Sequence, residues 1–162
     1  MVPIRVPPRV AWGLAGMMPH RESRVVVLDA SALIAVQNPS DRFHDSALSV
    51  LDELSDCEWL IHPLTHIELL VGPARAGGAE ALREAHSWFE RFGLQVSGDV
   101  EAIDLRAPEA REHLAVLRAV TLLKLPDAAV LHLALARNAT LVTGDRRLAG
   151  AARDHRLDVE EL

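Results

Sequence analysis

The fold is decided by the stretch Val25-Val26-Val27-Leu28-Asp29-Ala30-Ser31. Four aliphatic residues in a row, with no polar alternation, are typical of a strand buried on both faces of a parallel sheet. Ser31 then opens an apolar, helix-compatible segment. Asp29 would therefore lie at the carboxyl end of the sheet, where open α/β folds place their ligands. It could equally cap the helix, because Asp is a good N-cap, and this stretch alone leaves both interpretations open.

Strand-like runs alternate with helical patterns along the rest of the chain. Further short strands are expected at 59–61, 94–96, 140–143 and 157–159, and helices at 32–36, 47–54, 63–71, 79–92, 99–120, 127–137 and 146–153. The helix over 63–71 should be mostly buried and stop at Gly72-Pro73, and the one over 99–120 should restart at Pro108. The alternation predicts an α/β fold, a three-layer sandwich whose central, mainly parallel twisted sheet is flanked by helices.

Composition supports a single globular domain. The apolar fraction is 49% and the net charge is −6, which argues against a nonspecific coat for nucleic acid. The charge says little about an enzyme that takes a phosphodiester through bound cations. A single cysteine, Cys57, excludes an internal disulfide and suits the reducing cytoplasm. No apolar run approaches the length of a membrane-spanning helix.

Residues 1–24 are expected to be an extension outside the fold. They contain four prolines and an apolar patch broken by Gly13 and Gly16, which imitates a signal peptide only weakly. Met17 and Met18 offer later natural starts. Without this segment, 13 basic and 22 acidic residues remain, so the predicted domain over 25–162 is more acidic than the whole chain.

Four acidic residues stand out by their surroundings. Asp29, Asp127 and Asp145 lie at the ends of apolar elements, and Glu68 is the only carboxylate in its apolar helix. A carboxylate in a mostly buried setting is unfavourable unless it is paired, hydrogen-bonded or bound to a metal ion. Four of them converging at one sheet end would repel one another, and cations relieve that repulsion. An all-oxygen site of this kind suits Mg²⁺ or Mn²⁺ better than zinc.

Each acidic residue also has a simpler interpretation. Any one of the three aspartates could be a helix N-cap. Glu68 lies in mid-helix, so its alternative is an exposed position on a helix that only looks buried. The joint pattern favours a metal site over coincident caps.

Four motifs, in this order and spacing, carry a family resemblance. They are Val27-Leu28-Asp29-Ala30-Ser31-Ala32-Leu33, Thr65-His66-Ile67-Glu68-Leu69, Leu125-Pro126-Asp127-Ala128 and Leu141-Val142-Thr143-Gly144-Asp145-Arg146-Arg147-Leu148. With them the sequence resembles a PIN-domain ribonuclease, and specifically the VapC-type toxin of a VapBC toxin–antitoxin pair. The resemblance covers about Val25 to the C-terminus and implies that 25–162 is a PIN domain.

The resemblance implies a metal-dependent endoribonuclease that hydrolyses RNA phosphodiester bonds with Mg²⁺ or Mn²⁺. Asp29, Glu68 and Asp127 are then the expected ligands, and Asp145 completes the site or orients a water. Ser31 and Thr143 would hold carboxylates or waters in place. Arg146 and Arg147 are candidates for contacts with RNA phosphates, although surface salt bridges are the commoner use of such arginines.

Other chemistries fit the sequence less well. His62 and His66 have the i, i+4 spacing of zinc ligands but no HExxH arrangement, so hydrogen-bonded or partly exposed histidines are the simpler interpretation. A receiver domain or an aspartyl phosphotransfer enzyme would want a second acid where Ser31 stands. Lys124, the only lysine, precedes Asp127 on a connector instead of following a late strand. A noncatalytic PIN-like module that binds RNA or protein is the serious rival.

Partners are expected from the resemblance. It implies an RNA substrate, a homodimer and a VapB-like antitoxin that lies across the acidic groove. The apolar stripes over 47–54 and 79–92 are candidate surfaces for these contacts.

Overall fold

The structure is a computed structural model that describes residues 24–97 and 103–162. The extension predicted over 1–24 therefore lies outside the described residues, apart from Arg24, as does the start of the helix expected over 99–120. Five strands form one sheet: β1 (Val25–Leu28), β2 (Glu58–Ile61), β3 (Gln95–Val96), β4 (Thr140–Thr143) and β5 (Val159–Glu161). Their order is β3-β2-β1-β4-β5 and every neighbouring pair is parallel.

Side chains of the central strands alternate between two separate cores. Val27, Leu60 and Leu141 share a register and lie in one buried cluster. Val26 and Leu28 point to the opposite face and pack in the other cluster. Because both of its faces are buried, the central strand β1 is apolar at every position, as expected for a parallel sheet.

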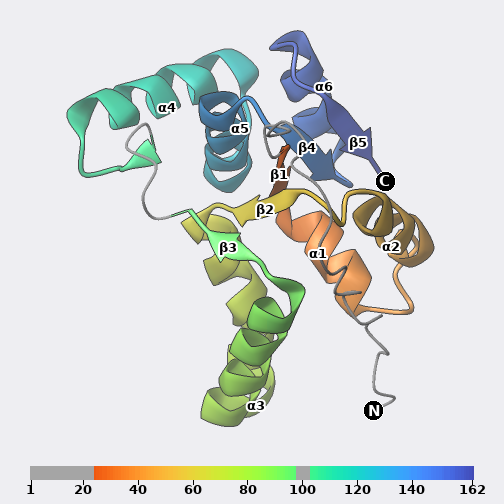
Figure 1. The fold of residues 1–162 in the computed structure, drawn as a ribbon. Coiled ribbons are helices and arrows are strands. Elements are labelled where there is room, and N and C mark those ends of the chain that lie inside the picture. Colours follow the sequence, from red (N-terminus) through yellow and green to blue (C-terminus); the bar gives the residue numbers. More distant parts are fainter. Residues whose placement is uncertain (1–23, 98–102) are drawn as a thin grey trace, which may run out of the picture.

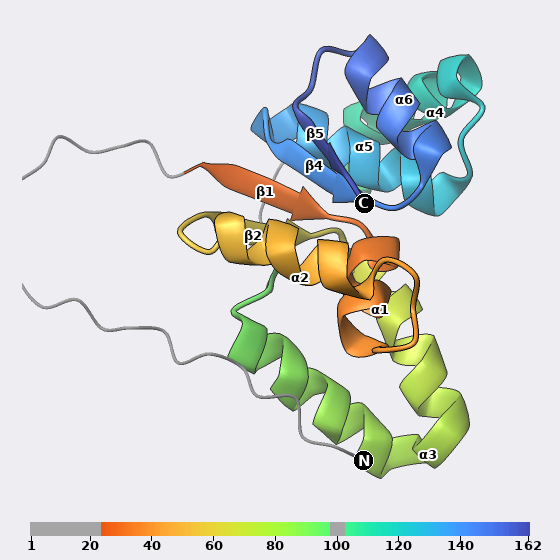
Figure 2. The ribbon, with the colours of Figure 1, turned by 90° about the vertical axis from the view of Figure 1, so that its right-hand side faces the viewer.

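Helices cover both faces of the sheet and complete three layers. Figure 2 shows α4 (Pro108–Thr121), α5 (Leu125–Arg137) and α6 (Arg146–Asp154) on one side, and α1 (Ala30–Gln37), α2 (His44–Glu53) and α3 (Pro63–Phe92) on the other. Figure 1 shows the central position of β1, between β2 and β4. The predicted three-layer α/β sandwich is confirmed.

Helix α3 differs from its prediction in extent and burial. It continues through Pro73 to Phe92, with a kink at Gly78, where φ is 58° and ψ is −133°. The predicted stop at Gly72-Pro73 is wrong. Proline has no N–H, so one helix carbonyl lacks its donor, but this segment is largely exposed and water can donate to that carbonyl instead. The expected burial is also wrong: Ile67 is 58% exposed and Glu68 is exposed too.

Three other boundaries are shifted. α4 begins at Pro108, where the restart was predicted, but residues 104–107, expected to be helical before it, are not. α5 begins at Leu125, two residues before Asp127, because Lys124 is its N-cap and Pro126 suits its first turn. The last strand is Val159–Glu161 rather than 157–159.

The two apolar stripes proposed as contact surfaces belong largely to the core. Ala47, Leu51 and Leu54 are buried. In the second half of α3, Phe89 is buried, and Trp88 packs against the same cluster. These side chains are therefore engaged within the chain. Within the described residues, no helix is long and apolar enough to cross a membrane.

Candidate active site

The topology brings four helix N-termini to one edge of the sheet. β1, β2 and β4 each run into a helix, so α1, α3 and α6 begin at the edge where the parallel strands end. α5 leads back into β4 and therefore runs opposite to the strands, which places its N-terminus at this edge too. We call it the carboxyl edge. Helix N-termini carry partial positive charge and favour nearby carboxylates.

Asp29 is fixed at the centre of this edge by two hydroxyl groups. It follows β1, is 7% exposed, and its backbone N–H donates to Val142 O at 3.0 Å. Ser31 Oγ donates to Asp29 Oδ2 at 2.6 Å, and Thr143 Oγ1 donates to the same oxygen at 2.9 Å. Asp29 occupies the N-cap position of α1, but its side chain makes no capping hydrogen bond. Its carboxylate is therefore committed to the site and not to the helix.

The direction of each hydrogen bond in this network follows from proton counting. Ser31 Oγ accepts from Gly144 N at 2.9 Å, and Thr143 Oγ1 accepts from Asp145 N at 3.0 Å. Each hydroxyl has one proton, which goes to Asp29. Neither hydroxyl therefore has a proton left to donate to the other, although Ser31 Oγ and Thr143 Oγ1 lie 3.4 Å apart. Within the described residues no hydrogen bond reaches Asp29 Oδ1, so this atom can take a ligand.

Asp145 is a true helix cap. Its Oδ1 accepts from Arg147 N at 2.7 Å and from Leu148 N at 3.1 Å, which satisfies two free N–H groups at the start of α6. Both bonds go to one oxygen, so the cap interpretation and a role for the second oxygen are compatible. Asp127, in contrast, is the third residue of α5 and not its N-cap.

Charge repulsion couples the four carboxylates. Glu68 is largely exposed, but partial burial of its carboxyl raises its pKa, and the charges of Asp29 and Asp127 raise it further. Burial likewise raises the pKa of Asp127, with added contributions from Asp29 and Asp145, while the charge of Lys124 lowers both pKa values. Glu68 comes from α3, Asp127 from α5 and Asp145 from the β4–α6 turn. The structure thus brings all four predicted acids within electrostatic range at the carboxyl edge.

The chemistry of this donor set fits a hard divalent cation, although the side chains as placed do not yet form a coordination sphere. All donors are carboxylate oxygens, which Mg²⁺ and Mn²⁺ prefer. Within residues 24–97 and 103–162, no group of three or more His, Cys, Asp or Glu side chains is arranged to hold an ion. Glu68 is exposed on its helix and therefore has the rotamer freedom to change its position when an ion binds.

The two arginines that follow Asp145 point to other partners. Arg147 donates to Leu122 O at 3.1 Å and so ties α6 to the end of α4. Arg146 has a side chain that is 92% exposed, with Nε 4.0 Å from Glu161 Oε1. Lys124, which the motif pattern did not single out, acts on the acids instead, because its charge lowers the pKa of Glu68 and of Asp127. The signal available in the sequence was its position three residues before Asp127.

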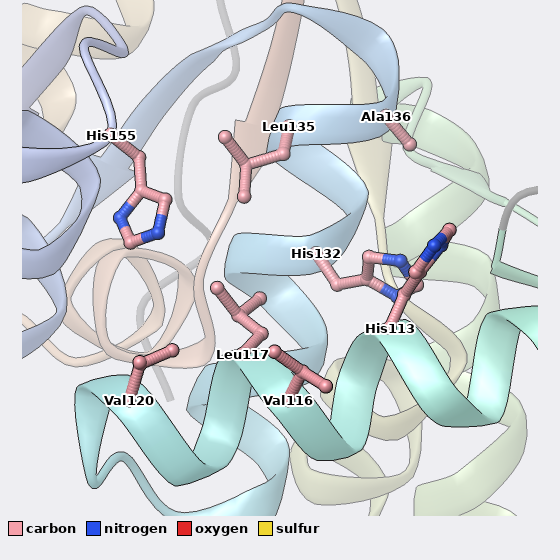
Figure 3. A pocket seen from close by; sticks show the side chains of 8 residues that line it. All are labelled: His113, Val116, Leu117, Val120, His132, Leu135, Ala136 and His155. Atoms are coloured by element: carbon pink, nitrogen blue, oxygen red, sulfur yellow. The ribbon is translucent and has the colours of Figure 1, made fainter.

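The histidines do not form a second site of this kind. His62 is buried and caps α3, with Nδ1 accepting from Leu64 N at 3.0 Å, and burial beside His132 lowers its pKa to about 4. His113, His132 and His155 line a groove between α4, α5 and the end of α6, with a volume of about 450 Å³. Figure 3 shows these side chains. The other side chains that line the groove are aliphatic, and none of the four acids lines it.

Comparison with known proteins agrees with the fold. The family described as PIN domain matches residues 26–154. No curated protein matches the sequence. Among solved structures, VapBC2 from Rickettsia felis bound to a promoter DNA fragment is similar, with a TM-score of 0.59 and 17% identity over 85% of this chain and 98% of that one.

Two further structures show the same architecture. VapBC-1 from nontypeable Haemophilus influenzae gives a TM-score of 0.62 at 18% identity, covering 85% of this chain and 97% of that one. A toxin–antitoxin complex from Klebsiella pneumoniae gives 0.53 at 24% identity, covering 77% and 91%. With the family match spanning most of its length, the chain belongs to the PIN domain family.

Proposed function

We propose that this protein is a Mg²⁺- or Mn²⁺-dependent endoribonuclease that acts as the toxin of a toxin–antitoxin pair. The observation that carries the proposal is the set of four coupled carboxylates at the carboxyl edge, with Asp29 held by two hydroxyls. Membership of the PIN domain family and the shared fold with chains of VapBC complexes support it.

The residues divide the chemical work between them. Asp29 Oδ1, Glu68 and Asp127 would hold the cation, and the second carboxylate oxygen of Asp145 would complete the site or orient a water. A divalent cation bound there supplies a lower pKa for water and neutralises charge on the phosphate. Ser31 and Thr143 keep Asp29 in one orientation, which limits the reorganisation needed when ligands enter.

An RNA cleavage assay tests this function. Single-stranded RNA is incubated with the protein in Mg²⁺ or Mn²⁺, and in EDTA. We expect cleavage that EDTA stops and that Asp29→Asn reduces at least 100-fold, because an amide cannot replace the carboxylate ligand. Asp52→Asn, an exposed aspartate on α2, is the matched control and should cleave like the wild type.

Two outcomes would contradict the proposal. Equal cleavage by the wild type and Asp29→Asn would mean that the assigned site is wrong. RNA binding without cleavage under any of these conditions would favour the noncatalytic PIN-like module instead.

The partners proposed are an RNA substrate, a VapB-like antitoxin and a second copy of the chain, all in the cytoplasm. The similar structures are described as VapBC and toxin–antitoxin complexes, which supports an antitoxin for this chain as well. Light scattering, on the protein alone and with the product of the adjacent gene, tests both associations. A monomer in both samples would contradict them.

A further inference from the structure

Lys124 is a cation built into the carboxyl edge. It is the N-cap residue of α5, one helical turn before Asp127, and its side chain is exposed. Among the described residues, none of the ion pairs within 4.0 Å includes it. Its ammonium group is therefore available to a ligand at this edge.

The backbone on both sides of this side chain is anchored. Lys124 O accepts from Ala128 N at 2.9 Å, in the first turn of α5. Two residues earlier, Leu122 O accepts from the Arg147 guanidinium at 3.1 Å. The connector between α4 and α5 is thus tied at two points, and the lysine side chain starts from a defined position.

The charge of Lys124 reaches carboxylates on two different elements. It lowers the pKa of Glu68 on α3 and of Asp127 on α5. Of the other nearby cations, Arg147 is bonded to a carbonyl of α4, and Arg146 faces Glu161 on β5. Among the described residues, Lys124 is therefore the cation whose charge acts on both acids that would share a metal ion.

We propose that Lys124, rather than Arg146 or Arg147, contacts a backbone phosphate of the RNA and sets the affinity for substrate. The inference rests on the proposed nuclease function. A chain of net charge −6 that presents four acids to a polyanion needs a local positive charge to hold it. An ammonium on a flexible stem binds a phosphate as a point charge from several directions, which suits a substrate held mainly through its backbone.

A structural role for Lys124 makes a different prediction. If the ammonium only offset repulsion between Glu68 and Asp127, its loss would make the site more negative and so strengthen cation binding, and the KM for RNA would not change. Such an effect would shrink at saturating Mn²⁺. A phosphate contact present equally in the ground state and the transition state instead raises KM and leaves kcat nearly unchanged.

The test compares Lys124→Gln and Lys124→Arg with Arg91→Gln, which removes one exposed charge at the far end of α3. Cleavage of a single-stranded RNA oligonucleotide is measured at saturating Mn²⁺. We expect Lys124→Gln to raise KM about tenfold, the size expected for one charge-assisted hydrogen bond at an exposed position. kcat should stay within twofold, Lys124→Arg should restore most of the affinity, and Arg91→Gln should behave like the wild type.

Binding provides a readout that does not depend on cleavage. In an Asp29→Asn background, fluorescence anisotropy of the labelled oligonucleotide is followed against salt concentration. Loss of one phosphate contact should reduce the slope of log Kd against log salt by about 0.7. An unchanged slope and KM in Lys124→Gln, with an active wild type, would overturn this inference alone. A wild type that neither cleaves nor binds RNA would overturn the proposed function and this inference with it.

Discussion

At the scale of single residues, Asp145 combines a helix cap with a charge that acts on another carboxylate. Its Oδ1 satisfies two backbone N–H groups of α6, while its charge acts on Asp127 across the site. Removal of the side chain would therefore change both the stability of the protein and its RNA cleavage. A substitution that retains only the helix cap separates these two effects.

Asp145→Ser should keep the stability and lose the activity. Serine caps helices about as well as aspartate, so urea unfolding should give a free energy of unfolding within about 0.5 kcal/mol of the wild type. Asp145→Ala should cost about 1 kcal/mol. RNA cleavage should fall at least tenfold in both variants. Wild-type cleavage by Asp145→Ser would show that Asp145 is only a cap.

The positions of the acids could be predicted from the sequence. The resemblance also predicted that Ser31 and Thr143 hold carboxylates, as both do for Asp29, but not which oxygen they bind. Asp29 and Asp145 follow buried apolar strands, and the ends of parallel strands meet at one edge. The choice of Asp29 Oδ2 by both hydroxyls depends on contacts between residues 112 to 114 positions apart. Lys124 was not predicted as part of the site, because its position three residues before Asp127 is a weak signal for an exposed residue of a connector.

At the scale of elements, α3 is two helical arms joined at Gly78. The backbone there has φ 58° and ψ −133°, which a residue with a side chain adopts only with strain. The sequence predicted two helices separated at Gly77-Gly78, and the kink at Gly78 agrees with that separation. The sequence could not show that the first arm is exposed, because Ile67 and Val71 are apolar and yet largely face solvent.

Two glycine-to-alanine changes should have opposite signs. Gly78→Ala should destabilise the protein by about 1–3 kcal/mol because of the positive φ. Gly150→Ala, in the interior of α6 with no heavy atom within 4 Å of the new Cβ, should stabilise it by about 0.5–1 kcal/mol. Urea unfolding of both variants measures this. Equal effects would contradict the conformation assigned to Gly78.

At the scale of the whole molecule, Glu68 and Asp127 link stability to pH. Glu68 and Asp127 have raised pKa values, so the folded protein holds protons that the unfolded chain has already lost. Their contribution to stability is fully present below the unfolded pKa values and is lost as pH rises through the raised ones. A bound cation favours the charged forms and should offset this loss.

Glu68→Gln should therefore stabilise the protein at pH 7 in EDTA while it reduces RNA cleavage. Mn²⁺ should raise the melting temperature of the wild type more at pH 7 than at pH 4.5. The increase at pH 7 should be smaller in Glu68→Gln than in the wild type. Glu53→Gln, an exposed glutamate on α2, is the control for the loss of one charge. Thermal unfolding with and without Mn²⁺ measures these effects. A Mn²⁺ effect that is independent of pH would contradict the assigned ligands.

The hydrogen bond between Thr143 and Asp29 also has a consequence for synthesis of the chain. The two residues are 114 positions apart, and β1 lies between β2 and β4 in the sheet. A nascent chain on the ribosome presents Asp29 long before Thr143, Gly144 and Asp145 have been made. The carboxyl edge has all four acids only after Asp145 has emerged. In the nuclease proposed above, the cutting site would thus form late, after the other elements that surround β1 have been made.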